Sequence, residues 1–222
     1  MQIAGLVKNS FVDYPGLVAA VVFVPGCNMD CWYCHNRALW KSGHRLETAE
    51  VMRFLEKRCG FLDGVVVSGG EPTLQPDLPQ LIRDVKAMGY RVKLDTNGLK
   101  PDVVEALLAD LDYVAMDIKA PPGQLGRVVS FDLCDEPVWR CADMLVKSDS
   151  DYEFRTTFMP TLDVADIEAM AQRVSGARRY VLQQYRKADG HSLSPEPHCH
   201  ETIKKAAEAA GKYAREVVIR GI

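Results

Sequence analysis

The chain has 222 residues, of which 47% are hydrophobic, so it can bury one sizeable core but is short for two typical domains. We therefore expect one domain over residues 1–222. The net charge of −3 comes from 27 basic and 30 acidic residues without a long run of one sign, which argues against a nucleic-acid-binding patch or a membrane-surface helix.

The N-terminal region shows no targeting signal. It has no basic segment followed by a continuous apolar run, because Asp13, Pro15 and Gly16 interrupt the apolar residues. No apolar stretch of about 18 residues occurs in the sequence, which argues against a transmembrane helix. The seven cysteines fit a reducing compartment, where thiols stay available for metals. We expect a cytoplasmic protein.

Apolar, β-branched runs alternate with amphipathic segments along the chain. The predicted strands are 18–24, 64–68, 90–96, 112–118, 152–158 and 179–184, with a last strand at 215–221. The predicted helices between them are 48–57, 78–88, 102–109, 138–147, 164–174 and 201–210. Residues 120–137 and 187–198 show neither pattern, so we expect surface loops there.

Six units of a strand followed by a helix favour a parallel sheet covered by helices, either doubly wound and open or a complete or partial barrel. An α+β domain would instead group its strands together. Polar motifs follow four successive strands, at residues 27–34, 68–75, 95–98 and 117–119. Because the carboxyl ends of parallel strands form the edge where such folds build their sites, we expect these motifs to belong to one site.

Three cysteines, Cys27, Cys31 and Cys34, lie within eight residues, with no fourth cysteine nearby. A disulfide framework would leave one of them over. A structural zinc site would need a fourth Cys or His, and the local candidate, His35, is awkwardly placed directly after Cys34. An iron–sulfur cluster normally takes four thiolates, so three would leave one iron open to another ligand.

With these motifs in view, the chain resembles the radical S-adenosylmethionine enzymes. Within them it looks most like the activating enzymes of glycyl radical proteins, such as those of pyruvate formate-lyase and anaerobic ribonucleotide reductase. The motif Cys-x3-Cys-x-aromatic-Cys is met by Cys27, Cys31, Tyr33 and Cys34, and the HNRALW sequence after it is also similar. The resemblance runs over nearly the whole chain and implies a single-domain α/β fold, a partial (β/α)6 barrel of TIM type.

The resemblance also implies the cofactors. The three cysteines would hold a [4Fe-4S] cluster as the catalytic centre, and its fourth iron would bind S-adenosylmethionine, whose reductive cleavage gives a 5′-deoxyadenosyl radical. The turn formed by Ser68, Gly69, Gly70 and Glu71 would bind the methionine amino group, since glycines let backbone acceptors approach a ligand closely. A Gly-Gly pair after a strand is, by itself, also an ordinary turn.

Later motifs would complete the cofactor site. On the resemblance, Lys119 would pair with the methionine carboxylate and Asp117 would lie near the ribose; the alternative is that both are solvated residues at a strand end. Arg155 would face the same site, and its apolar neighbours predict a paired partner. The predicted cofactor-binding residues are Tyr33, His35, Ser68, Gly69, Gly70, Glu71, Asp95, Thr96, Asn97, Asp117, Lys119 and Arg155.

A monovalent cation is also implied. Asp95 and Asp117, with backbone oxygens of Thr96 and Ala115, match the positions that form such a site in pyruvate formate-lyase activating enzyme. The remaining cysteines, Cys59, Cys134, Cys141 and Cys199, are predicted to be ordinary thiols. His191, His198 and His200 lie near Cys199, but their spacing does not argue for a metal site.

The function implied is abstraction of a hydrogen atom from a glycine of a partner glycyl radical enzyme, with a flavodoxin or ferredoxin as electron donor. Pyruvate formate-lyase activating enzyme carries a His near the end of the strand that here ends in Gln183 and Gln184, so the sequence leans toward the ribonucleotide reductase activators. One alternative is a radical enzyme that modifies a small molecule or peptide, like 7-carboxy-7-deazaguanine synthase. Another is a noncatalytic iron–sulfur or zinc module, which would have no use for Lys119 and Arg155.

Overall fold

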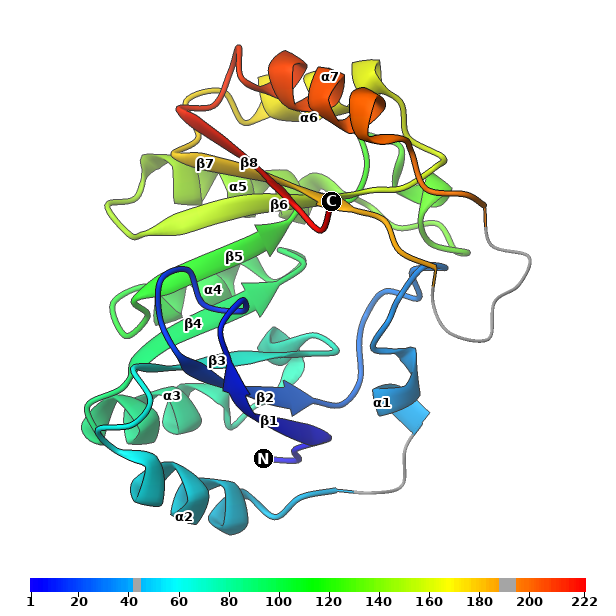
Figure 1. Cartoon of the computed structure of the whole chain (residues 1–222). Helices are drawn as coiled ribbons and strands as arrows, with labels where there is room; N and C mark the ends of the chain where they lie inside the picture. The colour runs from blue at the N-terminus through cyan, green and yellow to red at the C-terminus, as the bar shows by residue number, and fades with distance from the viewer. Residues whose placement is uncertain (42–44, 188–194) are drawn as a thin grey trace. The chain divides into compact units, whose positions relative to one another are not determined.

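The structure is a computed structural model that describes residues 1–41, 45–187 and 195–222 (Figure 1). Its strands follow one another along the hydrogen-bonded sheet in chain order, β1 to β8. The chain divides into two compact units. The first comprises Met1–Asn28, Asn36–Thr96 and Lys100–Ala115, and the second comprises Met29–His35, Asn97–Leu99 and Met116–Ile222. The expectation of one domain over residues 1–222 stays a prediction.

The first unit contains mainly parallel strands. They are β1 (Gly5–Ser10), β2 (Ala19–Val24), β3 (Gly64–Gly69), β4 (Arg91–Thr96) and most of β5 (Tyr113–Asp117). β1 is antiparallel to β2, whereas β2 pairs with β3, and β3 with β4, in parallel. Its helices are α1 (Arg37–Lys41), α2 (Thr48–Arg58), the 3-10 helix η1 (Pro72–Leu74), α3 (Leu78–Ala87) and α4 (Pro101–Leu107).

The second unit repeats the pattern. β6 (Tyr152–Phe158), β7 (Arg179–Gln184) and β8 (Glu216–Arg220) pair in parallel. The helices are the 3-10 helix η2 (Leu125–Arg127), α5 (Glu136–Lys147), α6 (Val164–Arg173) and α7 (His200–Ala210). Figure 1 shows α6 and α7 side by side, and the two helices pack against each other.

The alternation of strands and helices predicted from the sequence is confirmed, and every predicted strand and helix is found within a few residues of its expected bounds. The antiparallel strand β1 was not predicted, because its Lys8 and Asn9 hide the apolar run that marks the other strands. Of the loop predicted at 187–198, residues 188–194 lie outside the described part of the chain, and so does His191.

The core of the first unit includes one face of its sheet. Buried side chains of β2, β3 and β5 pack there with the loop that joins β1 to β2: Tyr14, Ala19, Val21, Val66, Tyr113 and Ala115, flanked by Leu17 and Phe23. β2 and β3 are buried almost throughout because parallel strands are covered on both faces. Within residues 1–41, 45–187 and 195–222, no helix has the length and apolar character needed to cross a bilayer.

One ion pair in the second unit should contribute strongly to stability. Arg220 of β8 donates from both guanidinium nitrogens to the two carboxylate oxygens of Glu153 on β6, at 2.8 and 2.7 Å. The Glu153 side chain is 0% exposed. Because breaking a buried pair leaves a charge in a poorly solvating environment, Arg220→Ala should lower the free energy of unfolding by about 3–5 kcal/mol, measured by urea denaturation.

A surface pair between β7 and β8 of the same unit provides the control. Arg179 of β7 lies 2.8 Å from Glu216 of β8, and the two side chains are 30% and 51% exposed. Solvent screens such a pair, so Arg179→Ala should cost less than about 1 kcal/mol. If the two variants lost the same free energy of unfolding, burial of Glu153 would not make its pair with Arg220 more stabilising than a surface pair.

Candidate active site

In the first unit, the turn after β3 packs directly on the residue before Cys27. The backbone N–H of Glu71 donates to the carbonyl oxygen of Gly26 at 2.8 Å. A Cβ atom at Gly70 would lie only 1.8 Å from that same oxygen. The two segments can approach so closely because Gly70 has no side chain and Gly26 adopts a φ of +76°. The first cysteine and the Gly-Gly-Glu turn are therefore neighbours in the folded chain.

The Glu71 side chain is engaged inside the protein. It is 1% exposed, and its Oε1 accepts hydrogen bonds from the backbone N–H of Thr73 at 3.1 Å and from the hydroxyls of Thr73 and Thr96 at 2.6 and 2.8 Å. These bonds cap η1 and tie the end of β3 to the end of β4. The geometry makes Glu71 a support for the turn, and its predicted contact with S-adenosylmethionine stays a prediction.

A second polar group lies at the ends of the same two strands. Ser68 donates to Oδ2 of Asp95 at 2.9 Å, and Nζ of Lys93 lies 2.5 Å from Oδ1 of the same carboxylate. Asn36, two residues after the last cysteine of the motif, donates to the carbonyl of Gly69 at 3.0 Å. Of the predicted site residues, the first unit thus holds Cys27, Ser68, Gly69, Gly70, Glu71, Asp95 and Thr96.

The second unit carries a compact charged group at the end of β5. Oδ1 of Asp117 lies 2.8 Å from Nε of Arg155, and Oδ2 lies 3.0 Å from Nζ of Lys119. The prediction that Arg155 has a paired partner is confirmed. Burial alone would raise the pKa of Asp117, but Arg155 and Lys119 outweigh it and lower this pKa to about 2. Burial opposes the charge of Lys119, yet Asp117 and its other neighbours hold the pKa of Lys119 well above its usual value.

Two of the three motif cysteines belong to the same unit. The N–H of Cys34 donates to the carbonyl of Cys31 at 3.1 Å, which turns the chain there. Burial raises the pKa of the Cys31 thiol, and the nearby Lys119 opposes this rise. Burial likewise raises the pKa of Tyr33, again against the effect of Lys119. Cys31 and Tyr33 therefore lie close enough to Lys119 to feel its charge.

The remaining predicted residues of the second unit are placed differently. Asn97 is buried, and its Oδ1 accepts a hydrogen bond from the backbone N–H of Leu99 at 3.0 Å, so it shapes the turn after β4. His35 is exposed. His198, considered in the sequence beside Cys199, stacks its ring on Phe158 and hydrogen-bonds through Nε2 to the Leu162 carbonyl at 2.8 Å.

The cysteines suit an iron–sulfur cluster by their chemistry. All seven are thiols rather than disulfides, and thiolates are the usual ligands of such clusters. In the described part of the chain, no three His, Cys, Asp or Glu side chains converge on one metal-ion position. A cluster has another requirement, because each thiolate binds a different iron atom. Cys27 belongs to the first unit and Cys31 and Cys34 to the second, and their role as the three ligands stays a prediction.

Sequence reasoning missed three side chains of the first unit. Asn36 and Thr73 are short polar residues just after the cysteine motif and the Gly-Gly-Glu turn, so nothing distinguished them. Lys93 is 1% exposed, although lysine side chains are mostly exposed in folded proteins. The signal available was its position: a lysine in the middle of a strand covered on both faces needs a partner, and Asp95 lies two residues on, on the same side.

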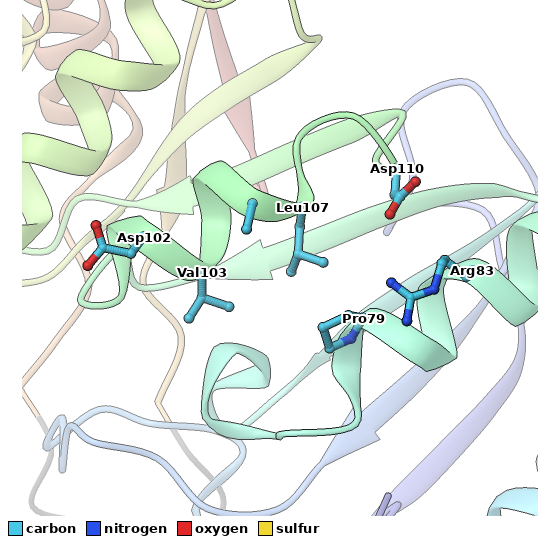
Figure 2. Close-up of a pocket in the computed structure, with 7 residues that line it drawn as sticks. Pro79, Arg83, Asp102, Val103, Leu107 and Asp110 are labelled. Carbon is cyan, nitrogen blue, oxygen red and sulfur yellow. The ribbon is translucent and has the colours of Figure 1, made fainter.

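A pocket of about 420 Å³ lies elsewhere on the first unit. Figure 2 shows it beside α3 and α4, with Asp102 at one end and Arg83 and Asp110 at the other. Pro79, Val103, Ala106 and Leu107 give it an apolar lining. None of the predicted site residues lines this pocket. The candidate site is therefore identified by the chemistry of its residues and not by this pocket.

A family model described as the radical SAM superfamily matches residues 21–174. The chain belongs to the radical SAM superfamily. Here SAM stands for S-adenosylmethionine, and the matched region includes all three motif cysteines together with Glu71, Lys119 and Arg155. Membership implies a [4Fe-4S] cluster and S-adenosylmethionine as cofactors of this radical SAM protein.

Curated relatives of this radical SAM protein include activating enzymes. A Methanocaldococcus jannaschii protein, provisionally named a glycyl-radical enzyme activating enzyme, is 36% identical over 235 aligned positions, covering 99% of this chain and 96% of its own. The pyruvate formate-lyase 1-activating enzyme of Escherichia coli is 35% identical over 118 positions, 49% of this chain and 48% of its own. The second similarity thus extends over only about half of each protein.

Solved structures show the fold. Streptococcus suis SuiB superposes with a TM-score of 0.70 at 15% identity, covering 90% of this chain and 49% of that one. A domain of a pyruvate-formate lyase-activating enzyme from Bacteroides vulgatus gives a TM-score of 0.59 at 17% identity, covering 71% of this chain and 99% of that domain. The predicted α/β fold of radical SAM type is therefore confirmed.

Proposed function

We propose that this radical SAM protein activates a glycyl radical enzyme by removing a hydrogen atom from the α-carbon of a partner's glycine. The observation that carries the proposal is the 36% identity to a provisionally named activating enzyme over nearly the full length of both chains. Similarity over both whole chains reaches beyond the residues that bind the cofactors. It therefore supports a common kind of target as well as common cofactors.

The cofactors, when bound, supply a 5′-deoxyadenosyl radical from one electron and S-adenosylmethionine. The protein's own tasks are to hold and orient. Cys27, Cys31 and Cys34 would ligate three irons. The Gly-Gly-Glu turn, held against Gly26 by the Glu71 N–H, would present backbone acceptors to an ammonium group. Lys119 has three N–H donors and would offer them to a carboxylate.

The partner that we propose is an anaerobic ribonucleoside-triphosphate reductase or a close relative. The absence of a His at Gln183 and Gln184 favours this partner over pyruvate formate-lyase. In this chain Gln184 instead donates to the carbonyl of His198 at 2.8 Å. A flavodoxin or ferredoxin is the proposed electron donor. The complex with the partner would be transient, because the glycine loop must leave its own protein to reach this one.

The decisive experiment follows the hydrogen atom. The protein is reconstituted with iron and sulfide under anaerobic conditions, reduced with dithionite and mixed with S-adenosylmethionine and a candidate partner labelled with [2,2-²H]glycine. We expect one deuterium in the 5′-deoxyadenosine formed and a glycyl radical signal in the partner's electron paramagnetic resonance spectrum. A partner with its radical glycine replaced by Ala is the control and should give neither result.

The outcomes separate the levels of the proposal. If the 5′-deoxyadenosine contained no deuterium with any glycyl radical enzyme tried, the radical chemistry would stand but the activating function would be contradicted. A small molecule or peptide would then be favoured as the target. No 5′-deoxyadenosine from a fully reduced four-iron protein would contradict the radical chemistry itself.

Lys119 should matter for binding S-adenosylmethionine but not for assembling the cluster. Its side chain is 14% exposed and its Nζ is held by Asp117 at 3.0 Å, so it is positioned to bind an anion. A hydrogen bond to a charged group contributes about 1.5–3 kcal/mol, so Lys119→Met should weaken S-adenosylmethionine binding about 10- to 100-fold, measured by equilibrium dialysis. Lys147→Met, at the exposed end of α5, is the matched control. Unchanged affinity in Lys119→Met would refute a role for this ammonium in cofactor binding.

A further inference from the structure

β4 contains a buried ammonium group. Lys93 lies in the middle of the strand, is 1% exposed, and pairs in register with Val66 of β3. Residues paired in this way point to the same face of a parallel sheet, and Val66 belongs to the apolar core of the first unit. An ammonium in such surroundings is costly unless a carboxylate neutralises it.

Asp95 is the neutralising group. Lys93 Nζ lies 2.5 Å from Asp95 Oδ1, and Ser68 Oγ donates to Oδ2 at 2.9 Å. Both oxygens of the carboxylate therefore accept hydrogen bonds within the first unit. Asp95 is 14% exposed at the end of the strand, so this arrangement fixes its orientation where the predicted cofactor site begins.

This geometry conflicts with the monovalent cation expected from the sequence. That cation would use Asp95 as a ligand, close to an ammonium already in contact with the same carboxylate. Two positive charges at such short range repel strongly where water is largely excluded. Na⁺ and K⁺ also bind oxygen ligands, and Oδ1 of Asp95 is already in contact with Lys93. A bound cation beside Asp95 therefore does not fit the residues of this chain.

We propose that the Lys93 ammonium takes the place of a monovalent cation: a charge built into β4 neutralises and orients Asp95, so that the protein needs neither Na⁺ nor K⁺. The effect of Lys93 on the stability of the protein does not depend on any cofactor. Its effect on S-adenosylmethionine binding rests on the proposed function. A covalently attached charge would keep this part of the site in one state at any salt composition.

The first test measures stability and needs no cofactor. The melting temperature of the full chain is compared in KCl, NaCl and choline chloride at one ionic strength. The wild-type protein should melt within about 1 °C in all three salts. Lys93→Met should melt lower in choline and regain about 5 °C on saturation with K⁺ or Na⁺, since a cation that binds only the folded state stabilises it. Lys93→Met combined with Asp95→Asn removes both charges and should lose this response.

Two results would overturn the proposal: a wild-type melting temperature that rises by several degrees in KCl or NaCl over choline, or a folded Lys93→Met variant that responds to neither cation. A variant that folds only with K⁺ or Na⁺ would support it. If Lys93→Met does not fold in any salt, the wild-type comparison decides.

The second test measures S-adenosylmethionine binding to the reconstituted wild-type protein. The dissociation constant should agree within about twofold between KCl and choline chloride. If K⁺ lowered the dissociation constant about tenfold or more, the proposal that Lys93 replaces a cation would be refuted. A cation that the site requires would strengthen S-adenosylmethionine binding when it binds. A wild-type protein that binds no S-adenosylmethionine in any salt would contradict the proposed function. The melting comparison would still decide the role of Lys93.

Discussion

Replacing Cys31 with Ala should abolish the four-iron cluster and reduce 5′-deoxyadenosine formation to background. Cys31 is buried beside Cys34, near Lys119 and Asp117, so no solvent-exposed ligand can readily take its place. With all three thiolates, one iron of the cluster has no protein ligand. Without Cys31, two irons would have none. The measurements are iron and sulfide content per chain and the yield of 5′-deoxyadenosine after anaerobic reconstitution.

The control is another buried cysteine, outside the motif. Cys141 on α5 is 0% exposed and lies in the same unit. Cys141→Ala removes one buried sulfur, so it should cost some stability and leave iron content and activity near the wild-type values. A Cys31→Ala protein that retains four irons and full cleavage activity would refute the ligand assignment. Equal iron loss in both variants would point to general destabilisation instead.

Replacing Gly70 with Ala should disrupt the site through the backbone. The new Cβ would lie 1.8 Å from the carbonyl oxygen and 2.6 Å from the carbonyl carbon of Gly26. Backbone atoms cannot rotate away, so the two turns must separate. This separation would break the bonds from the Gly70 and Glu71 N–H groups to the carbonyls of Val24 and Gly26, 2.9 and 2.8 Å long. We expect a loss of about 3 kcal/mol or more in unfolding free energy, since overpacking often costs 1–3 kcal/mol where side chains can still adjust.

The same variant should assemble little cluster, because Cys27 follows the displaced Gly26 directly. Urea denaturation and iron content measure the two effects. Gly126→Ala is the control, since a Cβ at Gly126 meets no atom within 4 Å and its φ lies outside the positive range; it should change stability by less than about 0.5 kcal/mol. A stable Gly70→Ala protein with a full cluster would show that the turns can move apart without affecting the site.

The strands and helices were predictable because their signals are local. A strand such as β3, with Val65, Val66 and Val67 in succession, is recognised by β-branched residues that need burial on both faces. β1 escaped prediction because it lies at one end of the strand order, and Val7, Lys8 and Asn9 in it are exposed. A short strand with so little burial leaves little apolar pattern in the sequence.

The types of residue at the candidate site were also predictable, whereas their contacts were not. The motif cysteines stand out by spacing, and Arg155 by its apolar neighbours. The engagement of Glu71 with Thr73 and Thr96 depends on how the ends of β3 and β4 meet. The amino-acid sequence does not distinguish a carboxylate that accepts three hydrogen bonds inside the protein from a carboxylate that binds a ligand.

By itself, the sequence determined the α/β class, the placement of polar motifs after successive strands, and the three thiols that suit an iron–sulfur cluster. These features depend on periodicity and spacing along the chain. Only the tertiary structure decided that Gly70 must be a glycine, that Asp117 is held between Arg155 and Lys119, and that Lys93 neutralises Asp95. Close approach, burial and charge pairing are set by distances between side chains and turns of different strands, and those distances exist only after the strands have aligned.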